Sequence, residues 1–134
     1  MSYELALVVG RILFGGYFAF SGLNHLMNSD QLSGWVEAKG FSSPDLLVYL
    51  SGLMLLAGGL GIMAGAYPVI SILLLGVFLA AVTPTFHDFW NFEGEEKQSH
   101  MVNFQKNLAL LGALLMALSL DWSIYALGLS LGLL

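Results

Sequence analysis

The residues of this chain that could do chemistry gather in one stretch, residues 86–112. The stretch holds two of the three histidines, two of the four Lys and Arg residues and four of the nine acids of a 134-residue chain. His87 and His100 could exchange protons near neutral pH, because imidazole titrates in that range. Asp88 cannot face His87 within one helix, since adjacent helical residues point apart. We therefore expect the Asp88 carboxylate to pair with Lys97 or Lys106.

A polar stripe forms the second half of this stretch. Its members are spaced three and four residues apart, which places them on one face of a helix: His100, Asn103, Lys106 and Asn107. Polar groups that descend into an apolar helix indicate an intramembrane functional site. The alternative is structural: the two asparagines join helices through hydrogen bonds, and Lys106 reaches back to the membrane surface.

The elements that must position these residues are apolar helices. The chain is 57% hydrophobic and 10% charged, with a mean hydropathy of +0.80. Runs of about 20 apolar residues are long enough to cross a bilayer as helices, and lipid leaves no alternative to helix within such a run. The sequence predicts a single all-α domain over residues 1–134, an integral membrane four-helix bundle. The expected spans are about 5–27, 45–64, 68–86 and 100–120, with polar connectors 28–44 and 87–99.

Four antiparallel spans would bring both long connectors to one face of the membrane, together with His25, His87, Asp88 and His100. Gly15, Ala19 and Gly22 form a stripe of small residues that should let another helix approach closely. Ser43-Pro44-Asp45 predicts a helix start with a capping serine. After the fourth span, the apolar tail from Ser123 onward should either extend the helix or lie at the membrane surface.

Arg11 lies about two turns inside the first predicted span. A guanidinium is costly in lipid, so it should either reach the nearer membrane surface as an anchor or face the bundle as a ligand or relay group. Both alternatives are open on the sequence alone.

Composition also excludes several classes of function. The net charge of −5 argues against nucleic acid as a partner, and the absence of cysteine removes thiolate ligands and disulfide exchange. The three histidines lie on different segments without metal-ligand spacing, so neither a metal nor haem is expected. No nucleophile elbow, Walker loop or dinucleotide motif is present, and the residues do not decide whether the chain is an enzyme. The N-terminus has no basic leader or cleavage site, which favours a retained first span.

Three pieces of the sequence resemble the DoxX family of small four-span membrane proteins: GRILFGGYFAFSGLNHL, SGLMLLAGGLGIMAG and, most specifically, FHDFWNFEGEEKQSHMVNFQKNLALLGALL. The positions that carry the resemblance are Arg11, Gly15, Ser21, Gly22, Asn24, His87, Phe89, Trp90, Gln98, Phe104, Lys106 and Asn107. Many relatives carry a glutamate within the second span, where this chain has Met54, Leu55 and Leu56. Any proton or ligand handling by that acid would differ here.

The absence of any extra targeting region fits a multi-pass protein of a bacterial or archaeal inner membrane, in contact with membrane lipid. The resemblance implies a subunit linked to a quinone-dependent oxidoreductase, such as a quinol oxidase or a thiosulfate:quinone system, or to a thiol or oxidative-stress assembly. A partner protein or a homo-oligomer is expected. Family membership by itself does not prove catalysis.

The sequence and the resemblance together lead to a quinone-like lipophilic ligand. His87 and Lys106 would bond to its oxygens, Asn103 and Asn107 would orient it, and Asp88 and His100 would connect the site to water for proton exchange. The alternative is a non-enzymatic membrane scaffold that recruits or stabilises a partner protein through the same polar residues. A small transporter is a weaker third hypothesis, because four spans enclose little water and no inverted repeat is evident.

Overall fold

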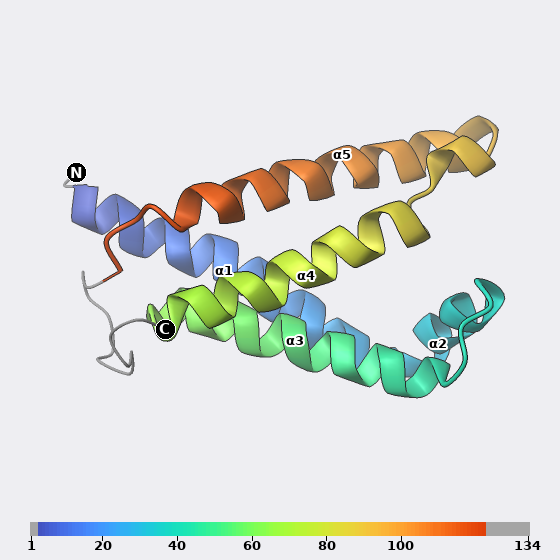
Figure 1. The fold of residues 1–134 in the computed structure, drawn as a ribbon, viewed down its shortest axis with the longest axis horizontal. Helices are drawn as coiled ribbons and strands as arrows, with labels where there is room; N and C mark the ends of the chain where they lie inside the picture. The colour runs from blue at the N-terminus through green and yellow to red at the C-terminus, as the bar shows by residue number, and fades with distance from the viewer. Residues whose placement is uncertain (1–2, 123–134) are drawn as a thin grey trace.

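The computed structural model describes residues 3–122, and the elements of this part of the chain are all helical (Figure 1). The predicted tail from Ser123 onward lies outside the described residues. The elements, in chain order, are α1 (Tyr3–Met27), α2 (Ser29–Ala38), α3 (Pro44–Ala64), α4 (Pro68–Phe86), the single 3-10 turn η1 (Phe89–Asn91) and α5 (Gly94–Ala117).

The four long helices run alternately up and down, and they pack in the order α1, α3, α4, α5 (Figure 1). The N-terminus of α1, the turn between α3 and α4, and the end of α5 lie at one end of the molecule. The other end, which we call the polar end, carries α2, η1 and the first turns of α5. The structure thus confirms the predicted all-α membrane architecture and its division into two unlike ends.

Three stretches of the described chain are long and apolar enough to cross a membrane: Tyr3–Met27, Pro44–Ala64 and Pro68–Asn91. The fourth long helix, α5, is less apolar because it carries Glu95, Glu96 and Lys97 in its first turns and Lys106 near its middle. It begins at Gly94, six residues before the expected start of the fourth span, and ends at Ala117 rather than near Leu120. The acids of its first turn suit a helix N-terminus outside the apolar layer, where they complement the helix dipole.

The contact between α1 and α3 is made through glycines, as the stripe of small residues predicted. A Cβ on Gly22 would lie 2.5 Å from the backbone nitrogen of Leu56, and one on Gly15 would lie 2.5 Å from the carbonyl oxygen of Gly59. The two backbones therefore touch directly, and no larger residue fits at these positions. This contact fixes how α1 presents its other faces to the rest of the bundle.

The helix ends follow the turn residues, with one correction. Gly65 adopts φ 67° and closes α3, and Pro68 then opens α4. At the start of α3, Pro44 occupies the first turn as expected, but the predicted serine cap is wrong. Ser43 has φ 53° and its side chain makes no capping hydrogen bond. The left-handed turn sets the direction of the chain there, and the hydroxyl lies outside capping geometry.

Candidate ligand cavity at the polar end

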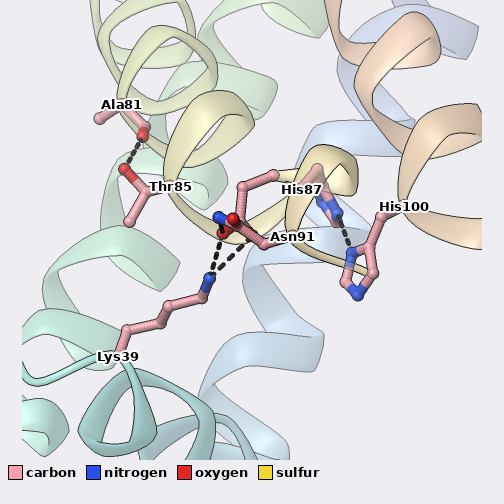
Figure 2. Close-up of polar contacts among 7 residues, drawn as sticks. Lys39, Ala81, Thr85, His87, Asn91 and His100 are labelled. Carbon is pink, nitrogen blue, oxygen red and sulfur yellow. Dashed lines mark hydrogen bonds and ion pairs between the residues drawn. The ribbon is translucent and has the colours of Figure 1, made fainter. Parts of the chain in front are cut away.

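Two histidines meet at the polar end. His87 follows the last residue of α4, His100 lies on α5, and their Nδ1 atoms are 3.3 Å apart (Figure 2). The ring of Phe92 stacks on His100 with centroids 4.1 Å apart. A hydrogen bond between two ring nitrogens requires one to donate and the other to accept, so at least one of the two rings must be neutral.

Asp88 is held by a partner that sequence reasoning missed. Lys39 Nζ, from the turn after α2, donates to both carboxylate oxygens at 2.7 and 2.8 Å, and Asn91 Nδ2 donates to Oδ2 at 2.8 Å (Figure 2). The expected pairing of Asp88 with Lys97 or Lys106 is therefore wrong. Asp88 is only 7% exposed, and its carboxylate fastens the connector after α2 to the end of α4.

A cavity of about 640 Å³ opens beside these residues, and all five α-helices contribute to its walls. This volume is within the range of about 300–1,000 Å³ that small-molecule sites occupy. Most of the wall is apolar, including Phe18, Leu55 and Phe78. The polar side chains of the lining are Tyr17, Ser21, His25, Trp35, Ser51, Thr85, His87, Lys106 and Asn107.

The predicted polar stripe of α5 divides between the cavity and its surroundings. Lys106 and Asn107 line the cavity. Asn103 lies behind Lys106 and accepts a hydrogen bond from its Nζ at 3.1 Å, while its own amide nitrogen donates to the carbonyl of Ser99. His100 does not line the cavity, but it contacts His87, which does. Asn103 and His100 are thus placed to orient the residues that line the cavity.

Asn107 is the most deeply buried polar residue of the lining, at 6% exposure. Within residues 3–122 its side-chain amide makes no hydrogen bond to the protein. The amide atoms are open to the cavity rather than sealed between the helices, so a molecule in the cavity can form the hydrogen bonds that the protein does not. This side chain is therefore the strongest indication that the cavity receives a polar group from outside the chain.

Two hydroxyls of the lining, those of Thr85 and Ser51, are already engaged. Thr85 Oγ1 donates to the carbonyl of Ala81 at 2.7 Å, one turn before Pro84 (Figure 2). Ser51 Oγ donates to the carbonyl of Val48 at 2.8 Å. Helix α4 continues through Pro84 to Phe86, and the Thr85 hydroxyl provides a donor for the Ala81 carbonyl near its end. These two hydroxyls bond within their own helices, which leaves the histidines, Lys106, Asn107 and the hydroxyls of Tyr17 and Ser21 as the polar groups that a ligand could meet.

The second helix covers part of the cavity. Leu32, Trp35 and Val36 of α2 line it, and Phe41 stacks on Phe86 of α4 with centroids 6.2 Å apart. Each residue of the Lys39–Asp88 ion pair is two positions from a residue of this stack, so both contacts join the same connector to the end of α4. The segment predicted as a polar connector, residues 28–44, thus contains a helix that closes one side of the cavity.

Arg11 lies away from the cavity, near the opposite end of α3. It is 5% exposed, its Nη2 donates to the carbonyl of Met63 at 3.4 Å, and its guanidinium packs against Gly65. The side chain of Arg11 faces the bundle and does not reach the membrane surface as an anchor. Its neighbours are the last carbonyls of α3, a favourable position for a cation at a helix C-terminus.

Sequence reasoning missed a stripe on α1. Tyr17, Ser21 and His25 are four residues apart, so they share one face of α1, and all three line the cavity. The four-residue spacing of polar groups inside an apolar span was the available signal. Lys106 Nζ lies 5.8 Å from the centre of the Tyr17 ring, which links this stripe to α5.

No group of three or more metal-binding side chains occurs within residues 3–122. The His87–His100 pair brings two imidazoles together without a third ligand. The chemistry that the described residues support is hydrogen bonding and proton exchange with an uncharged or anionic polar group in an apolar cavity.

Comparisons with known proteins place the chain in a family. The DoxX family model matches residues 6–88, which is more than half of the chain. The matched region contains α1, α2, α3 and α4 and stops at Asp88, so α5 and most of the third resembling piece lie outside it. Searches of curated proteins and of solved structures found no match. The chain belongs to the DoxX family.

Proposed function

We propose that this membrane protein binds a quinone-like lipophilic ligand in the cavity at the polar end, and that it serves as a small subunit of a quinone-linked redox complex. The observation that carries the proposal is Asn107, a residue only 6% exposed that lines a cavity of about 640 Å³ and whose side-chain amide makes no hydrogen bond within residues 3–122.

The walls of the cavity suit a ligand that is mostly apolar with a small polar head. Apolar side chains from all five α-helices would cover a ring and the start of a hydrocarbon tail. The polar groups of α4 and α5 gather at one part of the wall, where His87, Lys106 and Asn107 could donate to ring oxygens. Ammonium and amide groups donate well to carbonyl oxygens.

The residues around the cavity would support proton exchange. His87 is linked to His100 through their Nδ1 atoms, so a proton taken up at one ring can be passed to the other. Asp88 is engaged by Lys39 and Asn91 and holds the end of α4 in place. In this proposal His87 is the residue next to the ligand and His100 connects it toward solvent.

The test is ligand binding to the purified protein in mild detergent. Quinones quench indole fluorescence on contact, and Trp35 lines the cavity. A decyl-tailed benzoquinone should quench the wild type in a saturable way. The His87→Ala, Lys106→Ala double variant should bind it at least tenfold more weakly, because two hydrogen bonds to the head are lost.

Lys97→Ala is the matched control, since Lys97 lies on the exposed first turns of α5 and not in the cavity. It should bind the quinone as the wild type does. Unchanged binding by the double variant would rule out the proposed site. Mass spectrometry of the protein purified from its native membrane, on lipids and proteins alike, tests for a bound quinone and for a partner subunit.

A non-enzymatic scaffold is the second candidate function. The observation in its favour is a pair of exposed indoles on segments of the polar end, Trp35 at 59% and Trp90 at 55% exposure. Exposed tryptophans are frequent anchors in protein interfaces. A stoichiometric protein partner recovered without any quinone, and lost with Trp90→Ala, would support this function instead.

A further inference from the structure

The α1 wall of the cavity carries an imidazole whose Nδ1 atom is hydrogen-bonded to the backbone. His25 Nδ1 lies 2.9 Å from the carbonyl oxygen of Ser21, one turn earlier in α1. A carbonyl oxygen can only accept, so Nδ1 must carry the hydrogen and donate. In the neutral ring the other nitrogen, Nε2, is then a hydrogen-bond acceptor.

The ring of His25 is held in place by its neighbours. It contacts Phe78 of α4 edge to face, with centroids 5.8 Å apart. Gly52 of α3 packs closely against the base of the side chain, since a Cβ there would lie 3.0 Å from the Cβ of His25. Within the described chain Nε2 has no hydrogen-bond partner, and His25 belongs to the cavity lining. When the ring is neutral, the α1 wall therefore offers a hydrogen-bond acceptor, His25 Nε2.

The α5 wall offers donors. Lys106 is a cation with only donor hydrogens, one of which is used on Asn103. Asn107 has a free amide group that can also donate. An acceptor on α1 and donors on α5 line the same cavity. Ligands of similar size should therefore bind with different affinities according to the hydrogen-bond donors and acceptors they carry. A ligand matches both walls when it has one hydroxyl that donates and one oxygen that accepts.

We propose that the cavity selects the reduced, hydroquinone form of its ligand, with a ring hydroxyl donating to His25 Nε2 and the opposite oxygen accepting from Lys106 or Asn107. This inference rests on the proposed function and specifies the redox form. The two oxygens of an oxidised quinone can only accept, so that form leaves His25 Nε2 without a partner. The inference concerns binding preference and involves no electron transfer through the chain.

The experiment compares a decyl-tailed benzoquinone with its hydroquinone, under anaerobic conditions at pH about 8, where histidine side chains are generally neutral. Competition against quinone quenching of tryptophan gives both affinities. The wild type should bind the hydroquinone about three- to tenfold more tightly, which is the net effect of one additional hydrogen bond. His25→Phe keeps a ring against Phe78 but removes the acceptor, so it should bind both forms equally.

Asn24→Ala is the matched control, because Asn24 is the adjacent polar residue of α1 and does not line the cavity. It should keep the preference. Equal binding of both forms by the wild type would overturn this inference and leave the proposed function intact. This comparison uses the wild type alone, so it does not depend on the folding of any variant. A preference that persists in His25→Phe would overturn it as well. Binding of neither form would refute the proposed function itself.

Discussion

Lys39 and Asp88 are 49 positions apart in the chain, and the lysine ammonium contacts both oxygens of the carboxylate at 2.7 and 2.8 Å. The pair joins the connector after α2 to the end of α4, next to the cavity that both segments line. The side chain of Asp88 is 10% exposed and that of Lys39 29% exposed. Solvent therefore screens the pair only in part.

We predict that Lys39→Met destabilises the protein by about 1–3 kcal/mol, because it leaves a buried carboxylate with Asn91 as its remaining side-chain donor. Adding Asp88→Asn should recover part of that loss, since the double variant has no unpaired charge. Thermal unfolding in one detergent, followed by circular dichroism, measures both. Additive losses in the double variant would contradict the assigned pair.

The glycine contact between α1 and α3 gives a prediction with an internal control. Gly22→Ala places a Cβ 2.5 Å from backbone atoms of α3 and should destabilise by roughly 1–3 kcal/mol through overpacking. Gly16→Ala adds the same methyl group on the same helix where nothing lies within 4 Å, so it should be neutral or slightly stabilising. Equal melting temperatures for the two variants would show that the helices do not touch at Gly22.

Arg11 should prove structural rather than ligand-binding. Arg11→Met removes the cation beside the last carbonyls of α3, and we expect a loss of about 1–3 kcal/mol in stability. Quinone affinity, measured by tryptophan quenching below the melting temperature, should stay within twofold of the wild type. A tenfold loss of affinity with unchanged stability would return Arg11 to the ligand site.

Asn107→Leu should separate stability from binding. Leucine has a similar volume and needs no hydrogen bond, so the ligand-free variant should melt at a higher temperature than the wild type. The same change removes a donor from the cavity and should weaken quinone binding by about three- to tenfold. A variant that is less stable without ligand would indicate that Asn107 is satisfied within the protein.

The sequence determined the four long helices and their order, but not the helix within the connector 28–44 or the bounds of α5. Long apolar runs cannot stay in lipid without internal hydrogen bonds, so the runs themselves indicate helices. The short turn at Gly65 and Pro68 made α3 and α4 antiparallel neighbours, and that placed His25, His87 and His100 at one end. The spacing of Asn103 and Lys106 predicted a shared helix face, and the two side chains do bond to each other.

The tertiary structure decided which side chains meet. The partner of Asp88 depends on how far the connector after α2 folds back, and no local spacing encodes that distance. The cavity depends on the rotation of each helix, which the backbone contact at Gly22 sets for α1. That rotation turns His25 toward the cavity, while Arg11, fourteen residues earlier by the sequence numbering, packs at the far end of α3. Which side chains meet between two helices depends on how each helix is rotated and tilted against the other, and amino-acid composition specifies neither.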